Sequence, residues 1–193
     1  MAAPEAITMR NLSGIWGFNK SLSDDPEPWY KLQGMPCIFQ KLLPRATFTN
    51  TITQTNDERG FTRIQTHSKM TGGFEFNPEP YILDGLEHAT AGGVQHVRAE
   101  WVDFRRPKPT NVCGEPIDSY LTQGWLEDSN AATWDHVYVH TANERGGWVM
   151  EDVWGFSLID EKRYFVAKSL MRKGEYCMRM ALVREWKGPL PKP

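Results

Sequence analysis

Hydrophobic and polar residues alternate with a period of two through most of this sequence. In residues 46–55, Phe48, Asn50 and Ile52 share one face and threonines the other, and "DERG" leads into a second alternating segment. Successive side chains of a strand point to opposite faces, so this pattern predicts a hairpin over 46–70 with one solvent-exposed face. Further strands are expected at 81–85, 94–104, 119–127, 132–142, 146–159, 163–171 and 175–186.

The front of the chain departs from this alternation. After a short strand at 13–19, Ser23 or Asp24 can cap a helix with Pro26 in its first turn and Gly34 at its end, and a second short helix begins at Pro36. Consecutive short antiparallel strands favour closure into a barrel, because closure removes exposed edges. We therefore predict a single all-β domain over 1–193: an up-and-down antiparallel β-barrel of about 9–10 strands, with a helical cap at about 23–44.

The segment 105–118 is too long for a hairpin turn and contains three prolines. Loops of this length without secondary structure commonly have a function, for example as a flap. We expect this one to cover one mouth of the barrel.

Composition narrows the class of protein. The chain has 193 residues, 40% of them hydrophobic, and its net charge of −2 comes from well-mixed acids and bases. No basic field would attract nucleic acid or anionic lipid, and no stretch approaches the roughly 20 apolar residues of a membrane span. The three cysteines are far apart and show no CxxC spacing, which is typical of reduced thiols. We expect a cytoplasmic protein with no nucleic-acid partner and no membrane span.

Arg179 is a candidate ligand anchor in the last strand. It shares a face with Ala181 and Val183, whereas Arg184 shares the other face with Met180 and Leu182. A buried guanidinium is costly unless an anion or polarised oxygen satisfies it. Either arginine could instead be structural, and a shift of one residue in register decides between them.

Asp152 is a candidate general acid. Trp148, Met150, Trp154 and Phe156 share its face, and this face is the bulkier one, so we expect it to point inward. Desolvation there would raise the pKa of the carboxyl group and keep a proton available for transfer. The alternatives are a bulge that exposes Asp152 and a structural ion pair.

The strand at 132–142 leaves its inward face open. Trp134, His136 and Tyr138 alternate with Val137 and Val139, so either the polar set contacts a ligand or the valines face inward. Two histidines of this strand are four residues apart, about 13 Å, which is too far to chelate one metal ion. We expect no metal site. The sequence contains no GxGxxG, P-loop, GxSxG or HExxH motif, so no cofactor is expected either.

Two segments resemble those of calycins, the lipocalin and fatty-acid-binding-protein superfamily. "GIWGFNKSLSDDPEPWYKLQGMPCIFQKLL" is similar to their opening, with G-x-W on the first strand, a helix ending in L-x-G and a second helix. "CMRMALV" resembles their last strand, C-x-R-x-Y, with Arg179 on the arginine and Ala181 in place of the tyrosine. The resemblance implies a calycin-like barrel. It also implies a late-strand arginine that either contacts the ligand or packs across Trp16.

The segments "NLSGIW", "FNKSLSDDPEP" and "LQG" resemble segments of small fungal lipocalin-like proteins of natural-product pathways. These include hetero-Diels–Alderases that join a tropolone quinone methide to a humulene-type alkene. The resemblance implies a cofactor-independent pericyclase acting on a hydrophobic polyketide or terpenoid intermediate, after acid-assisted dehydration to a quinone methide.

The expected roles follow from these two lines of reasoning. Arg179 would hold the substrate oxygen and Asp152 would relay a proton. The other expected substrate-binding residues are Trp16, His136, Tyr138, Trp148, Met150, Trp154 and Phe156. The alternative function is a non-catalytic carrier of a hydrophobic metabolite or fatty acid, and a weaker one is a structural barrel filled by its own aromatic side chains. Whether the chain forms a homodimer is left open.

Overall fold

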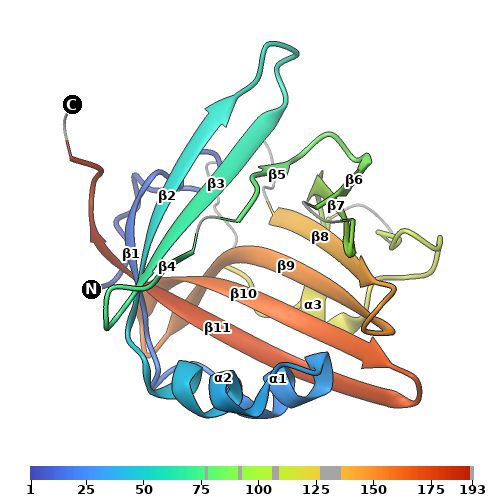
Figure 1. Ribbon diagram of the computed structural model, residues 1–193. Coiled ribbons are helices and arrows are strands. Elements are labelled where there is room, and N and C mark those ends of the chain that lie inside the picture. The colour runs from blue at the N-terminus through green and yellow to red at the C-terminus, as the bar shows by residue number, and fades with distance from the viewer. Residues whose placement is uncertain (77, 91–92, 106–108, 127–135, 192–193) are drawn as a thin grey trace.

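The computed structural model describes residues 1–76, 78–90, 93–105, 109–126 and 136–191. Its strands form one antiparallel sheet that curls into a barrel, as predicted, and the described ranges contain eleven strands rather than nine or ten (Figure 1). The strands are β1 (Gly14–Phe18), β2 (Phe48–Asn56), β3 (Thr62–Met70), β4 (Glu75–Phe76), β5 (Tyr81–Ile82), β6 (Glu87–Ala89), β7 (Gln95–Val102), β8 (His136–Asn143), β9 (Trp148–Ile159), β10 (Lys162–Lys173) and β11 (Tyr176–Gly188). The helices are α1 (Glu27–Gln33), α2 (Cys37–Leu42), the 3-10 turn η1 (Leu43–Arg45) and α3 (Ser119–Thr122).

The first and last strands are neighbours in the sheet. β1 pairs with both β2 and β11, and Trp16 lies opposite Trp186. From β11 the sheet continues through β10, β9, β8 and β7 to β6, each strand beside the one that precedes it in the chain. The predicted up-and-down order is therefore confirmed.

The remaining side of the barrel, between β3 and β7, is bridged by the segment around β5. Tyr81 and Ile82 pair with β3, and the next backbone groups reach both neighbours. Leu83 N donates to Thr62 O at 2.9 Å, and Gly85 N donates to Ala99 O at 3.0 Å. Figure 1 shows β5 in this gap between β3 and β7.

One end of the barrel, which we call the closed end, is filled by aromatic side chains. The ring of Trp16 lies 4.9 Å from that of Trp186, 5.3 Å from Phe165 and 6.3 Å from Phe156. Trp16 is fully buried, and its Nε1 donates to Leu12 O at 3.0 Å. This packing supplies the largest block of apolar burial in the molecule, the main stabilising term of a fold of this kind.

The helical cap lies where the sequence predicts it. Gly34 ends α1 in the left-handed conformation (φ 78°), which a residue without a Cβ adopts at little cost. From α1, Trp29 packs against Trp148, Met171 and Met180, at the end of the barrel opposite Trp16.

Neither Ser23 nor Asp24 caps α1, so that expectation was wrong. The N-cap is Pro26, with no side-chain hydrogen bond. Ser23 Oγ instead accepts from Val183 N at 2.8 Å and Asp24 Oδ2 from Ala181 N at 2.7 Å. β1 is too short to pair with residues 181–183 of β11. Ser23 and Asp24 therefore accept from the backbone N–H groups of Val183 and Ala181, which would otherwise have no partner in the sheet.

The segment before β8 packs on the outside of the barrel, which corrects two predictions. Residues 119–127 were expected to form a strand, but Asp118 accepts from Tyr120 N at 2.8 Å and begins the helix α3 instead. The loop at 105–118 was expected to cover a mouth. Its residue Ile117 and Leu121 of α3 contact Val153, whose side chain points out of the barrel. We call residues 109–126 the outer cover.

Candidate functional site

Asp152 faces the interior of the barrel, the lumen, as predicted. β9 pairs with β10 without a bulge through this position, and Asp152 lies opposite Ser169, whose hydroxyl donates to its carboxylate. Asp152 is 6% exposed. Burial raises its pKa to about 7, although the Ser169 hydroxyl and the positive charge of Arg184 oppose the rise. The carboxyl group can therefore carry a proton near neutral pH.

Arg184, not Arg179, is the arginine inside the barrel. It lies opposite Phe18 and Phe165 on the inward face, and its guanidinium carbon is 5.3 Å from the centre of the Phe165 ring. Burial lowers its pKa, while the charges of Tyr81 and Asp152 oppose this effect. By surface area the side chain is only partly buried.

Tyr81 brings a phenol to the same group of residues. It pairs with Ile64 on the inward face of β3, and its ring stands edge-on to Trp154 with centres 4.9 Å apart. Burial raises the pKa of Tyr81 to about 12, with a further rise from Asp152 and an opposing effect of Arg184. The phenol therefore stays protonated and can donate a hydrogen bond. We call Tyr81, Asp152, Ser169 and Arg184 the lumen cluster.

A cavity of about 210 Å³ extends from Tyr81 toward the capped end of the barrel. Its apolar wall includes Val97, Ala99, Trp148 and Met150, and Gln33 of α1 lies at its border. Polar residues, among them Glu79, His88 and Gln95, share the lining with these apolar ones, and small-molecule sites commonly combine an apolar wall with convergent polar groups.

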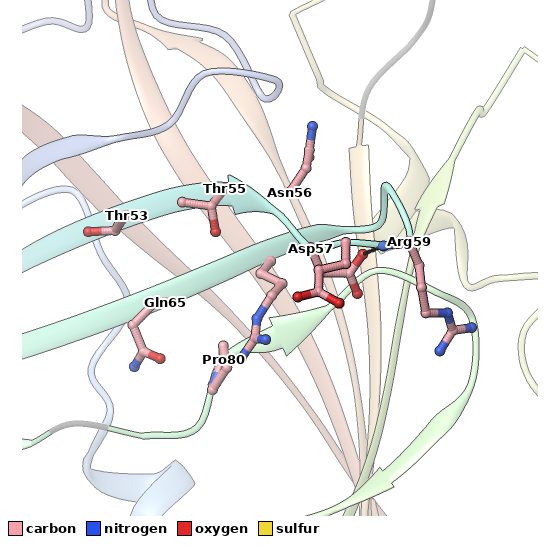
Figure 2. A pocket seen from close by; sticks show the side chains of 9 residues that line it. Thr53, Thr55, Asn56, Asp57, Arg59, Gln65 and Pro80 are labelled. Carbon is pink, nitrogen blue, oxygen red and sulfur yellow. Dashed lines mark hydrogen bonds between the residues drawn. The ribbon is translucent and has the colours of Figure 1, made fainter.

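A larger, open hollow of about 600 Å³ lies outside the barrel, on the outer face of the β2–β3 hairpin. Figure 2 shows its polar lining, which includes Thr53, Thr55, Asp57, Arg59 and Gln65. Its described lining is almost entirely polar or charged, which is not the character of a site for a hydrophobic molecule.

The structure contradicts the expected role of Arg179. Its side chain points out of the barrel, is 54% exposed and binds both carboxylate oxygens of Asp118, at 3.1 and 3.2 Å. Its guanidinium carbon is 5.3 Å from the ring centre of Tyr120. Arg179 therefore binds the outer cover. In the observed register of β11, the side chain that points into the barrel is that of Arg184.

His136 and Tyr138 also lie on the outer face, so neither lines the lumen. His136 packs between Phe104 and Trp125, with ring centres 4.9 and 5.3 Å away. Tyr138 is buried beneath the outer cover and donates to Glu151 Oε1 at 2.7 Å. The inward positions belong to the valines, Val137 and Val139, which was the alternative. Trp134 of the same expected strand lies outside the described residues.

The remaining predicted substrate-binding residues divide into two groups. Trp148 and Met150 line the cavity, and Trp154 contacts Tyr81. Trp16 and Phe156, by contrast, belong to the tightly packed closed end and have little surface left for a ligand.

Sequence reasoning missed Tyr81 and Ser169 and gave Arg184 only a structural role. Ser169 alternates with Phe165 and Ala167 on the inward face of its strand, which was a usable signal. Arg184 shares a face with Met178, Met180, Leu182 and Trp186, a bulkier set than that of Arg179. Tyr81 belongs to a strand of two residues, for which alternation gives no signal.

None of the helices in the described part of the chain is long and apolar enough to cross a membrane. Among the same residues, no three His, Cys, Asp or Glu side chains are grouped in a way that could bind a metal ion.

A single antiparallel sheet whose first and last strands pair, with two short helices after the first strand, is an up-and-down calycin-like barrel. Solved structures with some likeness include a point mutant of the fatty acid transporter REP1-NXSQ, with a TM-score of 0.47 and 11% identity over 91% of this chain and 98% of that one. Zebrafish ileal bile acid-binding protein, complexed with cholic acid, gives 0.46 and 11% over 91% and 98%.

No protein-family model matches the sequence. Among curated proteins, the pericyclase pydY of an Acremonium species is 31% identical over 98% of both chains. The probable pericyclase scpY of Mollisia scopiformis is 28% identical over 97% of this chain and 96% of its own. The chain therefore belongs to the pericyclase family of pydY.

Proposed function

We propose that this protein is a cofactor-independent pericyclase of secondary metabolism, which closes a ring in a hydrophobic polyketide or terpenoid intermediate bound in the lumen. Its membership of the family of pydY supports the reaction class. The lumen cluster, a protonatable acid and a cation enclosed by aromatic side chains, is the observation that carries the proposal.

Arg184 would hold an oxygen atom of the substrate. Negative charge that develops on a carbonyl or enol oxygen during cyclisation is stabilised most by donors already in place inside a dry site. An arginine guanidinium is a charged donor at neutral pH, and the Tyr81 hydroxyl is a second donor that stays protonated. Ring closure of this kind needs no further reagent, because holding two reacting ends together removes much of the entropic barrier.

Asp152 would supply the proton for the preceding dehydration. A protonated carboxyl group can give its proton to a substrate hydroxyl as the C–O bond breaks, so that water leaves and a conjugated system such as a quinone methide forms. A pKa of about 7 suits this task, because general acids work best when their pKa lies near the working pH. The hydrogen atom that the substrate loses in the same step needs an acceptor elsewhere in the lumen.

The test uses metabolite extract from the producing organism after deletion of this gene, incubated with the purified protein and followed by mass spectrometry. We expect a precursor to be replaced by an isomer, or by a product lighter by one water. Asp152→Asn should slow a dehydration-linked conversion roughly a hundredfold or more. Arg184→Leu should weaken conversion, whereas the matched control Arg179→Leu, on the opposite face of the same strand, should leave it unchanged. Binding without conversion would show a carrier instead.

The cytoplasm is the proposed location. Cys37, Cys113 and Cys177 are all free and exposed, and exposed free thiols persist best in a reducing compartment. Sedimentation of the purified chain would show whether it forms a homodimer.

A further inference from the structure

A histidine and an aspartate form a close pair beside the cavity that Tyr81 of the lumen cluster also lines. His88 Nε2 lies 3.0 Å from Asp84 Oδ1 and 3.1 Å from Asp84 Oδ2. Asp84 Oδ1 also accepts from Leu86 N at 2.9 Å. Although burial opposes the charged form, these two partners lower the pKa of Asp84, so it is a carboxylate at neutral pH.

The exposure of the two side chains shows which of them can meet a ligand. The Asp84 side chain is only 2% exposed, whereas the His88 side chain is 41% exposed. His88 lies opposite Val97 on β6 and β7, and Val97 faces the core. Both His88 and Val97 line the 210 Å³ cavity. The pair therefore presents the imidazole ring to the cavity and hides the carboxylate behind it.

The carboxylate settles which ring nitrogen is free. Because Asp84 is ionised and can only accept hydrogen bonds, the proton of the neutral ring belongs on Nε2, and Nδ1 keeps its lone pair. A histidine oriented by a buried carboxylate in this way is the arrangement that accepts and returns protons in many enzymes. Glu79 is the carboxylate among the described residues that line the cavity.

We propose that His88, oriented by Asp84, is the general base of the lumen and accepts a proton from a weakly acidic C–H or O–H of the bound intermediate. The identity of that intermediate rests on the proposed function. In the dehydration, His88 Nδ1 takes the proton, the bond electrons form the new double bond, and the hydroxyl leaves as water with the proton of Asp152. The imidazolium and the Asp152 carboxylate then exchange the proton through solvent, so no oxidant or reductant is needed.

The test uses 5-nitrobenzisoxazole, a small planar probe whose ring opening begins with proton abstraction. A base removes the single C–H proton, the electron pair forms the nitrile, and the N–O bond breaks to release a coloured phenolate. We expect the wild-type protein to open the probe faster than the same concentration of imidazole, with saturation. His88→Gln should lower kcat/KM about tenfold or more, less than for a natural substrate because the probe is not positioned.

The chain offers a matched control. His67 also pairs with a carboxylate, Glu75, at 3.4 Å, and is 40% exposed, but it lies on the outer face of β3. His67→Gln should therefore leave the rate unchanged. Asp84→Asn tests the positioning role: nitrogen NMR of the His88 ring should show the Nε2–H form in the wild type and a mixture in the variant, with a slower probe reaction.

Three results would overturn the proposal: equal rates for His88→Gln and wild type, an equal loss in His67→Gln, or a loss that follows Asp152→Asn instead. If His88→Gln unfolds, His88→Ala with added imidazole is measured in its place. Failure of imidazole to restore the rate in the folded variant would refute His88 as the general base. The probe reaction does not depend on the natural substrate. Failure of ring closure in the extract assay would therefore leave its outcome unaffected.

Discussion

The raised pKa of Asp152 makes a quantitative prediction about stability. The pKa of this carboxyl group is about 7 in the folded protein and lies near its ordinary value of 3.8 in the unfolded chain. Between these values the folded state holds a proton that the unfolded state has lost, so stability falls as pH rises through this range. Each pKa unit corresponds to about 1.4 kcal/mol, so the loss accumulates to about 4 kcal/mol above pH 7.

Asp152→Asn removes this titration and keeps an oxygen that can accept from Ser169 Oγ. The difference in unfolding free energy between variant and wild type should therefore shift in favour of the variant by about 3 kcal/mol between pH 5 and pH 8.5. Urea unfolding at both pH values measures it, and comparison of the two proteins cancels all other titrating groups. Ser169→Ala should extend the pH-dependent range upward, because its hydroxyl lowers the pKa of Asp152. A difference independent of pH would refute a buried, protonatable Asp152.

Three further variants test the architecture. Arg179→Ala removes an exposed ion pair and should cost about 1 kcal/mol or less, while hydrogen exchange in the outer cover speeds up. Tyr138→Phe removes the donor to a buried carboxylate and should cost about 1–3 kcal/mol in urea unfolding without changing probe turnover. Gly14→Ala places a Cβ 2.2 Å from the Trp186 ring and should lower the free energy of unfolding by about 1–3 kcal/mol, and an unchanged value would argue against the β1–β11 closure.

Alternation in the sequence predicted the strands, but it left the inward face of individual strands open. In β9, one face is plainly bulkier, and Asp152 was placed correctly. In β8 and β11 both faces carry apolar residues, so a shift of one residue exchanges the predicted inner and outer faces. Tyr138 and Arg179 were expected inside the barrel for this reason, and both lie on its outer face. The outer cover explains the ambiguity: it buries part of the outer face, so that face is apolar too.

Local signals also competed in the segment before β8. Residues 119–127 alternate like a strand, but the Asp118 side chain accepts from Tyr120 N, one of the free N–H groups in the first turn of a helix, and α3 forms. The lumen cluster depends on contacts far apart in the chain. Tyr81 contacts Trp154, and the charge of Arg184 opposes the rise in its pKa that burial causes, because the segment around β5 bridges the barrel. No local sequence pattern predicts this bridge.

Two neighbouring carboxylates of β9 show why the chemistry belongs inside the barrel. Glu151, on the outer face, accepts from Tyr138 Oη at 2.7 Å and from Arg172 Nη1 at 2.5 Å, so both of its oxygens are satisfied. Asp152, on the inner face, receives one side-chain hydrogen bond among the described residues, from Ser169. A buried carboxyl group with a single hydroxyl donor is better accommodated as the neutral acid, in agreement with the raised pKa of Asp152. The outer residue therefore links β8 and β10 on the outside of the wall through Tyr138 and Arg172, and the inner residue keeps a proton that a bound molecule can take.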